Sequence, residues 1–167
     1  GQEDGKNIIE VARASGINTL DTAIKYGKSE TCLGNIGLES LNVITKLPPV
    51  PDKVIDVSDW VHGQIQGSLQ RLNLTSLHGL LCHQSQQLLG IKGEALSRAM
   101  MQLKAEGIVQ KIGVSIYNPS ELEGLMDVCQ IDLIQAPFNL IDRRLQTSGW
   151  LQKLYNFDNW ISAKSYV

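Results

Sequence analysis

Residues Ile17 to Gly27 read Ile-Asn-Thr-Leu-Asp-Thr-Ala-Ile-Lys-Tyr-Gly, a short apolar run followed by a polar loop. The run delivers one carboxylate, Asp21, and a phenol, Tyr26, follows five residues later. An ionisable side chain at the end of a buried strand is costly unless it has a partner. Two further apolar runs end in Lys46 and His83. We therefore expect these four side chains to meet in one place.

Apolar runs of strand length alternate with segments of helical periodicity along the whole chain. This alternation predicts repeated strand–helix units on a parallel sheet. In the second of the expected helices, Ser29 is the predicted N-cap, because a serine hydroxyl accepts hydrogen bonds from the first turn of a helix. Helices are expected over residues 6–15, 29–38, 59–72, 93–106, 119–129 and 148–155, and strands over residues 17–22, 41–47, 77–83, 111–115, 131–137 and 160–167.

A parallel sheet of this kind is commonly either an open doubly wound sheet or an eight-stranded barrel. A dinucleotide-binding open sheet carries Gly-x-Gly-x-x-Gly after its first strand, and this sequence has no such motif. Polar residues instead follow successive strands, and in a barrel these strand ends converge on one mouth. We therefore predict an α/β fold of the (β/α)8 TIM-barrel type. A complete barrel needs about 250 residues, so residues 1–167 are expected to form one incomplete domain of about six strand–helix units, without the first and last strands.

Composition argues against several functions and partners. A formal net charge of -2 leaves no basic surplus for nucleic acid, and no apolar stretch is long enough to span a bilayer. The N-terminus shows no signal-peptide pattern. The cysteines Cys32, Cys82 and Cys129 are widely spaced, which predicts reduced thiols in a cytoplasmic protein and no metal site. Cys82 adjoins His83, but neighbours on a strand point to opposite faces, so we expect a buried structural thiol.

A carboxylate, an ammonium, a phenol and an imidazole form a set that could reduce a carbonyl group. A phenol has a pKa of about 10, and a nearby ammonium lowers it. We expect Asp21 to keep Lys46 charged, and Lys46 to tune Tyr26 as a general acid. His83 would orient the substrate carbonyl. Proteins contain no hydride donor of their own, so this chemistry implies a nicotinamide cofactor.

Four motifs occur in order along the chain. Leu-Asp-Thr-Ala-x-x-Tyr-Gly at residues 20–27, with Glu30 following, precedes Ile-Thr-Lys-Leu, Leu-Leu-Cys-His and Lys-Ala-Glu-Gly-Ile-Val-Gln-Lys-Ile-Gly-Val-Ser. Together they resemble the aldo-keto reductase superfamily, barrel enzymes that reduce carbonyl compounds with NADPH or NADH. The resemblance implies that the family's catalytic tetrad falls on Asp21, Tyr26, Lys46 and His83, the same residues that the strand ends suggest.

The resemblance also implies a nicotinamide site at the ends of the later strands. Ser115 would hold the nicotinamide amide and Gln135 would lie beside the ring, while Ile116 stands where the family usually has Asn. The polar loop at residues 84–87 replaces an aromatic-Pro sequence and favours a small polar carbonyl substrate, such as a sugar. The expected cofactor-binding residues are Ser115, Asn118, Gln135, Lys164 and Ser165.

Two other functions stay open at this level. Lys46 at a barrel mouth could form a Schiff base with a substrate, as in aldolases. An incomplete barrel exposes two sheet edges, so the chain could instead be a catalytically inactive or regulatory relative of the reductases. The sequence does not specify the substrate, the choice between NADPH and NADH, or the oligomeric state.

Overall fold

A computed structural model describes residues 2–155 and 160–164 of the 167-residue chain. Within them the chain forms one sheet in which the strands follow the order β1-β2-β3-β4-β5-β6. All neighbouring strands are parallel, so each connection crosses over one side of the sheet. The strands are β1 Thr19–Asp21, β2 Asn42–Leu47, β3 Leu77–Cys82, β4 Val109–Ser115, β5 Leu133–Pro137 and β6 Trp160–Lys164.

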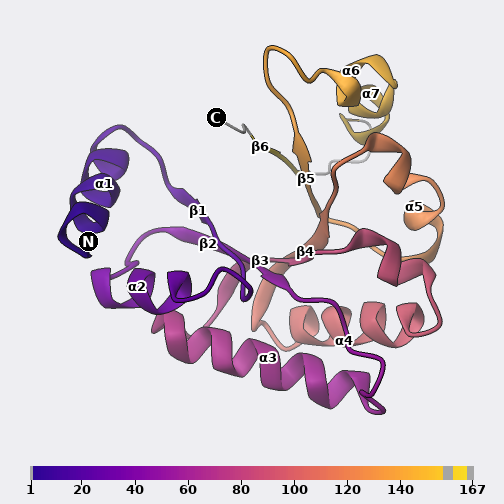
Figure 1. Cartoon of the computed structure of the whole chain (residues 1–167), viewed down its shortest axis with the longest axis horizontal. Coiled ribbons are helices and arrows are strands. Elements are labelled where there is room, and N and C mark those ends of the chain that lie inside the picture. The colour runs from indigo at the N-terminus through magenta and orange to yellow at the C-terminus, as the bar shows by residue number, and fades with distance from the viewer. Residues whose placement is uncertain (1, 156–159, 165–167) are drawn as a thin grey trace.

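The sheet curls, and its principal helices lie along the outer side, as Figure 1 shows. This arrangement confirms the predicted barrel type, in incomplete form: six strands are present in the described residues, whereas a closed barrel has eight. In those same residues, no helix has the length and apolar character needed to cross a membrane. The longer helices are α1 Gln2–Ala14, α2 Ser29–Ile36, α3 Val57–Leu72 and α4 Gly93–Ala105, and the shorter ones are η1 Ser85–Leu89, η2 Pro119–Leu122, α5 Leu125–Val128, α6 Arg144–Thr147 and α7 Trp150–Tyr155.

The core has two parts because alternate strand residues point to opposite faces of the sheet. The larger part fills the space between the sheet and the helices. The smaller part lies on the inner face and consists of Ile44, Leu81 and Leu133. At Gly113, a Cβ atom would lie 1.7 Å from the backbone oxygen of Leu133, so only glycine fits where β4 passes β5. Ile44, Leu81 and Leu133 therefore form a small apolar cluster on the inner face.

Several predicted boundaries are wrong for local reasons. The helix expected over residues 119–129 is divided into η2 and α5, because Gly124 between them has a left-handed φ of 77°. The third helix begins before residue 59, since the Asp56 side chain accepts a hydrogen bond from the Asp59 N–H and caps α3. The polar segment after β3 contains the short helix η1, and the loop after β5 contains α6, neither of which was expected.

One buried carboxylate connects three elements on the outer side of the sheet. Glu30 of α2 is only 2% exposed. Its Oε1 accepts hydrogen bonds from Thr45 Oγ1 on β2, at 2.7 Å, and from Ser68 Oγ on α3, at 2.6 Å. Its Oε2 accepts a 2.8 Å hydrogen bond from Arg71 Nε, also on α3. A buried charge needs such partners, so this network fixes α2 against both β2 and α3.

Glu30→Gln removes the charge from this network while keeping the size of the side chain. We expect the free energy of unfolding to fall by about 1–3 kcal/mol, because the neutral amide is a weaker acceptor than the buried carboxylate for the hydrogen bonds of Thr45, Ser68 and Arg71. Glu39→Gln is the matched control, since the Glu39 side chain is 87% exposed and lies 4.0 Å from Arg13; its effect should stay within about 0.5 kcal/mol. Urea unfolding measures both values. Equal unfolding midpoints for the two variants would contradict the structural role of Glu30.

Candidate active site

The ammonium of Lys46 lies at the centre of the candidate site and is completely buried. Its Nζ donates to both carboxylate oxygens of Asp21, at 2.7 Å each, and to the backbone oxygen of Thr22, at 2.8 Å. These bonds use all three hydrogens of the ammonium. Burial lowers the pKa of Lys46 below its ordinary value, while the hydrogen bond and charge of Asp21 oppose that shift.

Tyr26 and His83 complete the group. Their rings meet edge to face, with centroids 5.9 Å apart and an interplanar angle of 79°. Lys46 Nζ lies 5.2 Å from the centroid of the Tyr26 ring, within the range of a cation–π contact. The Tyr26 side chain is partly open to solvent, and His83 is half-buried directly after β3. The structure thus brings together the four residues that the sequence predicted to meet.

The pKa of Tyr26 is shifted upward. Partial burial raises it above its ordinary value, and the Asp21 carboxylate and the Tyr117 phenol raise it further. The net shift of the Tyr26 pKa is therefore upward, opposite to the lowering that was expected from Lys46. Burial is the largest cause of this shift, and the ammonium hydrogens of Lys46 are directed at Asp21 and Thr22. At neutral pH the phenol keeps its proton.

The loop that carries Tyr26 is closed by hydrogen bonds at its base. The hydroxyls of Thr22 and Ser29 lie 3.1 Å apart, and the Ser29 N–H donates to the Tyr26 backbone oxygen at 3.0 Å. The prediction that Ser29 caps α2 is therefore wrong. Lys28 occupies the cap position without a side-chain hydrogen bond, while the Ser29 hydroxyl faces Thr22. These hydrogen bonds fix where the loop leaves β1 and where it enters α2.

Ser115 and Gln135 lie side by side at the ends of β4 and β5. They are register partners, both are 1% exposed, and Ser115 Oγ donates to Gln135 Oε1 at 3.3 Å. Asn118 lies outside this pair. Its side chain caps η2 by accepting from the Ser120 N–H at 3.1 Å, which assigns it a local structural task. A cofactor contact from Asn118 stays a prediction.

The last two predicted residues fall at the end of the chain. Lys164 ends β6 and is the register partner of Pro137, the last residue of β5. Its backbone therefore lies at the carboxyl-terminal end of the strands, near that of Gln135. Ser165 lies outside the described residues.

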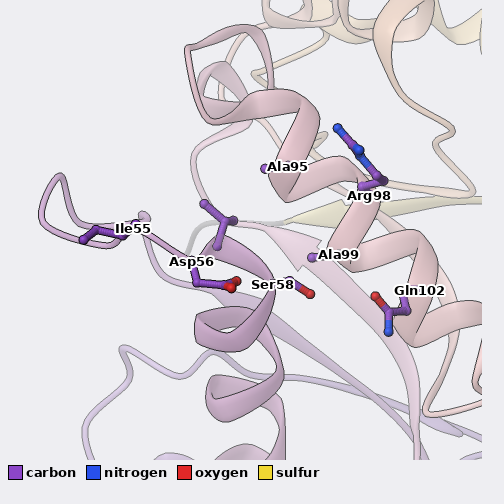
Figure 2. Close-up of a pocket in the computed structure, with 8 residues that line it drawn as sticks. Ile55, Asp56, Ser58, Ala95, Arg98, Ala99 and Gln102 are labelled. Atoms are coloured by element: carbon purple, nitrogen blue, oxygen red, sulfur yellow. The ribbon is translucent and has the colours of Figure 1, made fainter.

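A cavity of about 530 Å³ opens beside His83. The rings of His83 and Tyr117 and the loop after β3 form its walls, and the exposed Gln84 and Gln86 belong to that loop. Tyr117 had no signal in the sequence, because its position depends on how the loop after β4 folds back. A second cavity, of about 370 Å³, lies in the helix layer between the start of α3 and α4 (Figure 2). None of the predicted site residues lines the second cavity.

The structure does not favour a thiol nucleophile or a metal site. Cys82 is buried, its Sγ donates to the Gln84 backbone oxygen, and burial raises its pKa to about 12, so it is not a thiolate nucleophile at neutral pH. Within residues 2–155 and 160–164, no group of three or more His, Cys, Asp or Glu side chains is placed to hold a metal ion.

The loop after β2 is held at the same end of the sheet by one lysine. Lys92 Nζ donates to the backbone oxygens of Pro51, Asp52 and Val54, at 2.8 Å each. Gln87 adds a 2.9 Å hydrogen bond from the Val50 N–H to its Oε1. Two residues from the segment after β3, Gln87 and Lys92, therefore fix the loop that follows β2.

Asp21→Asn removes the counter-charge from a fully buried ammonium, so we expect the free energy of unfolding to fall by about 3–5 kcal/mol at pH 7. Lys46→Met should cost less, because the Asp21 side chain is 35% exposed and water can solvate it. Without the Asp21 charge, burial lowers the pKa of Lys46 further, so below about pH 10.5 the folded variant binds fewer protons than the unfolded chain. The stability of Asp21→Asn should therefore rise between about pH 7 and pH 10.

Urea unfolding of both variants at these two pH values measures the effect. Equal losses in the two variants, or an Asp21→Asn protein that becomes less stable as the pH rises, would show that the ammonium does not depend on Asp21.

Comparison with known proteins identifies the family. The profile of the aldo/keto reductase family matches residues 2–159. The aldo-keto reductase YhdN of Bacillus subtilis (strain 168) is 27% identical over 166 residues, covering 89% of this chain and 48% of that protein. The chain therefore spans about half the length of this relative.

Solved structures agree on the fold. An aldo-keto reductase from Bacillus halodurans superimposes with a TM-score of 0.81 at 18% identity, over 98% of this chain and 57% of the other. A glycerol dehydrogenase from Gluconobacter oxydans superimposes with a TM-score of 0.76 at 23% identity, over 96% of this chain and 53% of the other. By its sequence profile and its fold, this chain belongs to the aldo/keto reductase family.

Proposed function

We propose that this chain carries the proton-transfer site of an oxidoreductase that reduces an aldehyde or ketone to an alcohol, using NADPH or NADH. One observation carries the proposal: a phenol, an imidazole and a buried ammonium–carboxylate pair, from segments far apart in the sequence, lie together at one end of the sheet. Membership of the aldo/keto reductase family supports the same reaction class.

In this proposal Tyr26 is the general acid. Its raised pKa keeps the phenol protonated at neutral pH, so it can donate its proton to the carbonyl oxygen of the substrate. The ammonium of Lys46, 5.2 Å from the centre of the ring, stabilises the negative charge that develops on the phenol oxygen. Asp21 holds that ammonium in place, and His83 orients the carbonyl beside Tyr26.

The residues at the ends of β4 and β5 fit a nicotinamide. Ser115 and Gln135 present a hydroxyl and an amide from adjacent strands in a buried position, which suits the donor and acceptor atoms of a carboxamide. A bound NADPH or NADH supplies the hydride. Asn118, Lys164 and Ser165 complete the proposed cofactor site on the strength of the family resemblance.

The proposed substrate is a small polar carbonyl compound. The cavity beside His83 measures about 530 Å³, and the exposed amides Gln84 and Gln86 lie on its wall. We also propose a cytoplasmic location, because Cys32, Cys82 and Cys129 are free thiols.

The Schiff-base alternative is less well supported. A lysine that forms a Schiff base needs an accessible neutral amine. Burial does lower the pKa of Lys46, but the side chain is completely buried and its three hydrogens are bonded to Asp21 and Thr22. A substrate carbonyl therefore has no direct path to Nζ.

Titration of NADPH and NADH into this chain, followed by nucleotide fluorescence, tests the proposal. We expect saturable binding of at least one nucleotide. Tyr26→Phe should bind it equally well while carbonyl reduction falls by about 10²–10⁴-fold, because the proton donor is lost. Since the pKa of Tyr26 is raised, reduction by the wild-type chain should decline only at alkaline pH, and this decline should be missing from Tyr26→Phe.

Absence of binding by both nucleotides would overturn the reductase proposal and favour an inactive or regulatory role. Borohydride trapping of a substrate adduct on Lys46 would favour the Schiff-base reaction instead. Ser115→Ala serves as the cofactor-side comparison: it should weaken nucleotide binding, whereas Tyr26→Phe should not.

A further inference from the structure

The carboxylate of Glu121 joins the loop after β3 to the loop after β4. Its Oε1 accepts hydrogen bonds from the N–H groups of Tyr117 and Asn118, at 2.8 Å each, within its own loop. Its Oε2 accepts a 2.6 Å hydrogen bond from the hydroxyl of Ser85, which belongs to η1 and is fully buried. The two oxygens therefore serve different loops.

Helix capping accounts for only one of these oxygens. In the capping box of η2, the Asn118 side chain accepts from the Ser120 N–H and Glu121 accepts from the Asn118 N–H. Ser85 lies 36 residues earlier and has no part in that box. Burial alone would raise the pKa of Glu121, but the hydrogen bonds from Ser85 and the two backbone amides outweigh it and lower the pKa. The group is therefore charged at neutral pH.

The two joined loops lead directly from the proposed active site. Ser85 follows His83 by two residues, and Tyr117 follows Ser115 by two residues. The pairing of β3 with β4, adjacent strands in Figure 1, ends before His83. Beyond that point side-chain contacts such as the one at Glu121 determine how the loops lie relative to each other. The cavity beside His83 is lined by His83, Gln84, Ser85, Gln86, Tyr117 and Glu121, among others.

We propose that Glu121 is a positioning residue that acts through Ser85: it holds His83 at a fixed distance from the Ser115 side of the cofactor site. The inference rests on the proposed reductase function, because His83 and Ser115 are the residues whose separation it controls. Glu121 itself touches neither reactant. Its effect is to keep His83, which orients the carbonyl, at the right distance from Ser115, which contacts the nicotinamide.

Ser85→Ala tests this inference because it removes the Ser85–Glu121 bond and leaves the capping box intact; the longer 3.5 Å bond from Gln86 Nε2 to the Glu121 backbone oxygen does not involve the carboxylate. We expect kcat for carbonyl reduction to fall by about tenfold or more, with a smaller change in KM, since misplacement affects orientation more than binding. Glu121→Gln should lower kcat by a similar factor. The double variant should have the same kcat as the less active of the two single variants, because both changes affect the same contact. The His83 ring signals in an NMR spectrum should shift in all three proteins.

Ser97→Ala and Glu123→Gln are the matched controls, a buried serine of α4 and an exposed glutamate beside η2, and both should behave as wild type. Wild-type kcat and unshifted His83 signals in folded Ser85→Ala would overturn the inference while the reductase proposal stands. If the wild-type chain binds no nucleotide, the reductase proposal fails; the His83 signals then still decide whether Glu121 positions His83.

Discussion

A fully buried ammonium must have an acceptor for each of its hydrogens, and Lys46 sets this requirement for the whole site. Two acceptors come from Asp21 at the end of β1, and the third is the backbone of Thr22. The position of Lys46 on β2 therefore fixes where β1 ends, and the chain must turn directly after Asp21 and Thr22. The loop that follows carries Tyr26, so the position of the phenol depends on the hydrogen bonds that Lys46 makes to Asp21 and Thr22.

Beyond the strand ends, hydrogen bonds of polar side chains hold the loops in place, as backbone pairing holds the strands. A hydroxyl pair closes the Tyr26 loop, Lys92 holds the loop after β2, and Glu121 joins the loops after β3 and β4. The first contact joins the two ends of one loop, and the other two join residues of different segments. The mouth of the incomplete barrel is thus held by hydrogen bonds that either close one loop or fix it to a neighbouring loop.

Sequence periodicity was sufficient to predict the parallel strands and the meeting of Asp21, Tyr26, Lys46 and His83, because apolar runs and their polar ends are local signals. It could not give the direction of the Tyr26 pKa shift, which depends first on how far the folded chain buries the phenol. It also missed the bond between Ser85 and Glu121, since a contact across 36 residues leaves no periodic trace. Gly124 divides a predicted helix because one left-handed residue outweighs the propensities around it.

Thr45 and Lys46 are neighbours on β2, yet they belong to ionic networks on opposite faces of the sheet. Thr45 donates to Glu30 in the helix layer, and Lys46 pairs with Asp21 on the inner side. If β2 slipped by one residue, the ammonium would enter the helix layer and the hydroxyl would replace it in the site. Two charged groups would lose their partners at once. The alternation of these two side chains therefore disfavours any alignment of β2 that is shifted by one residue relative to its neighbours.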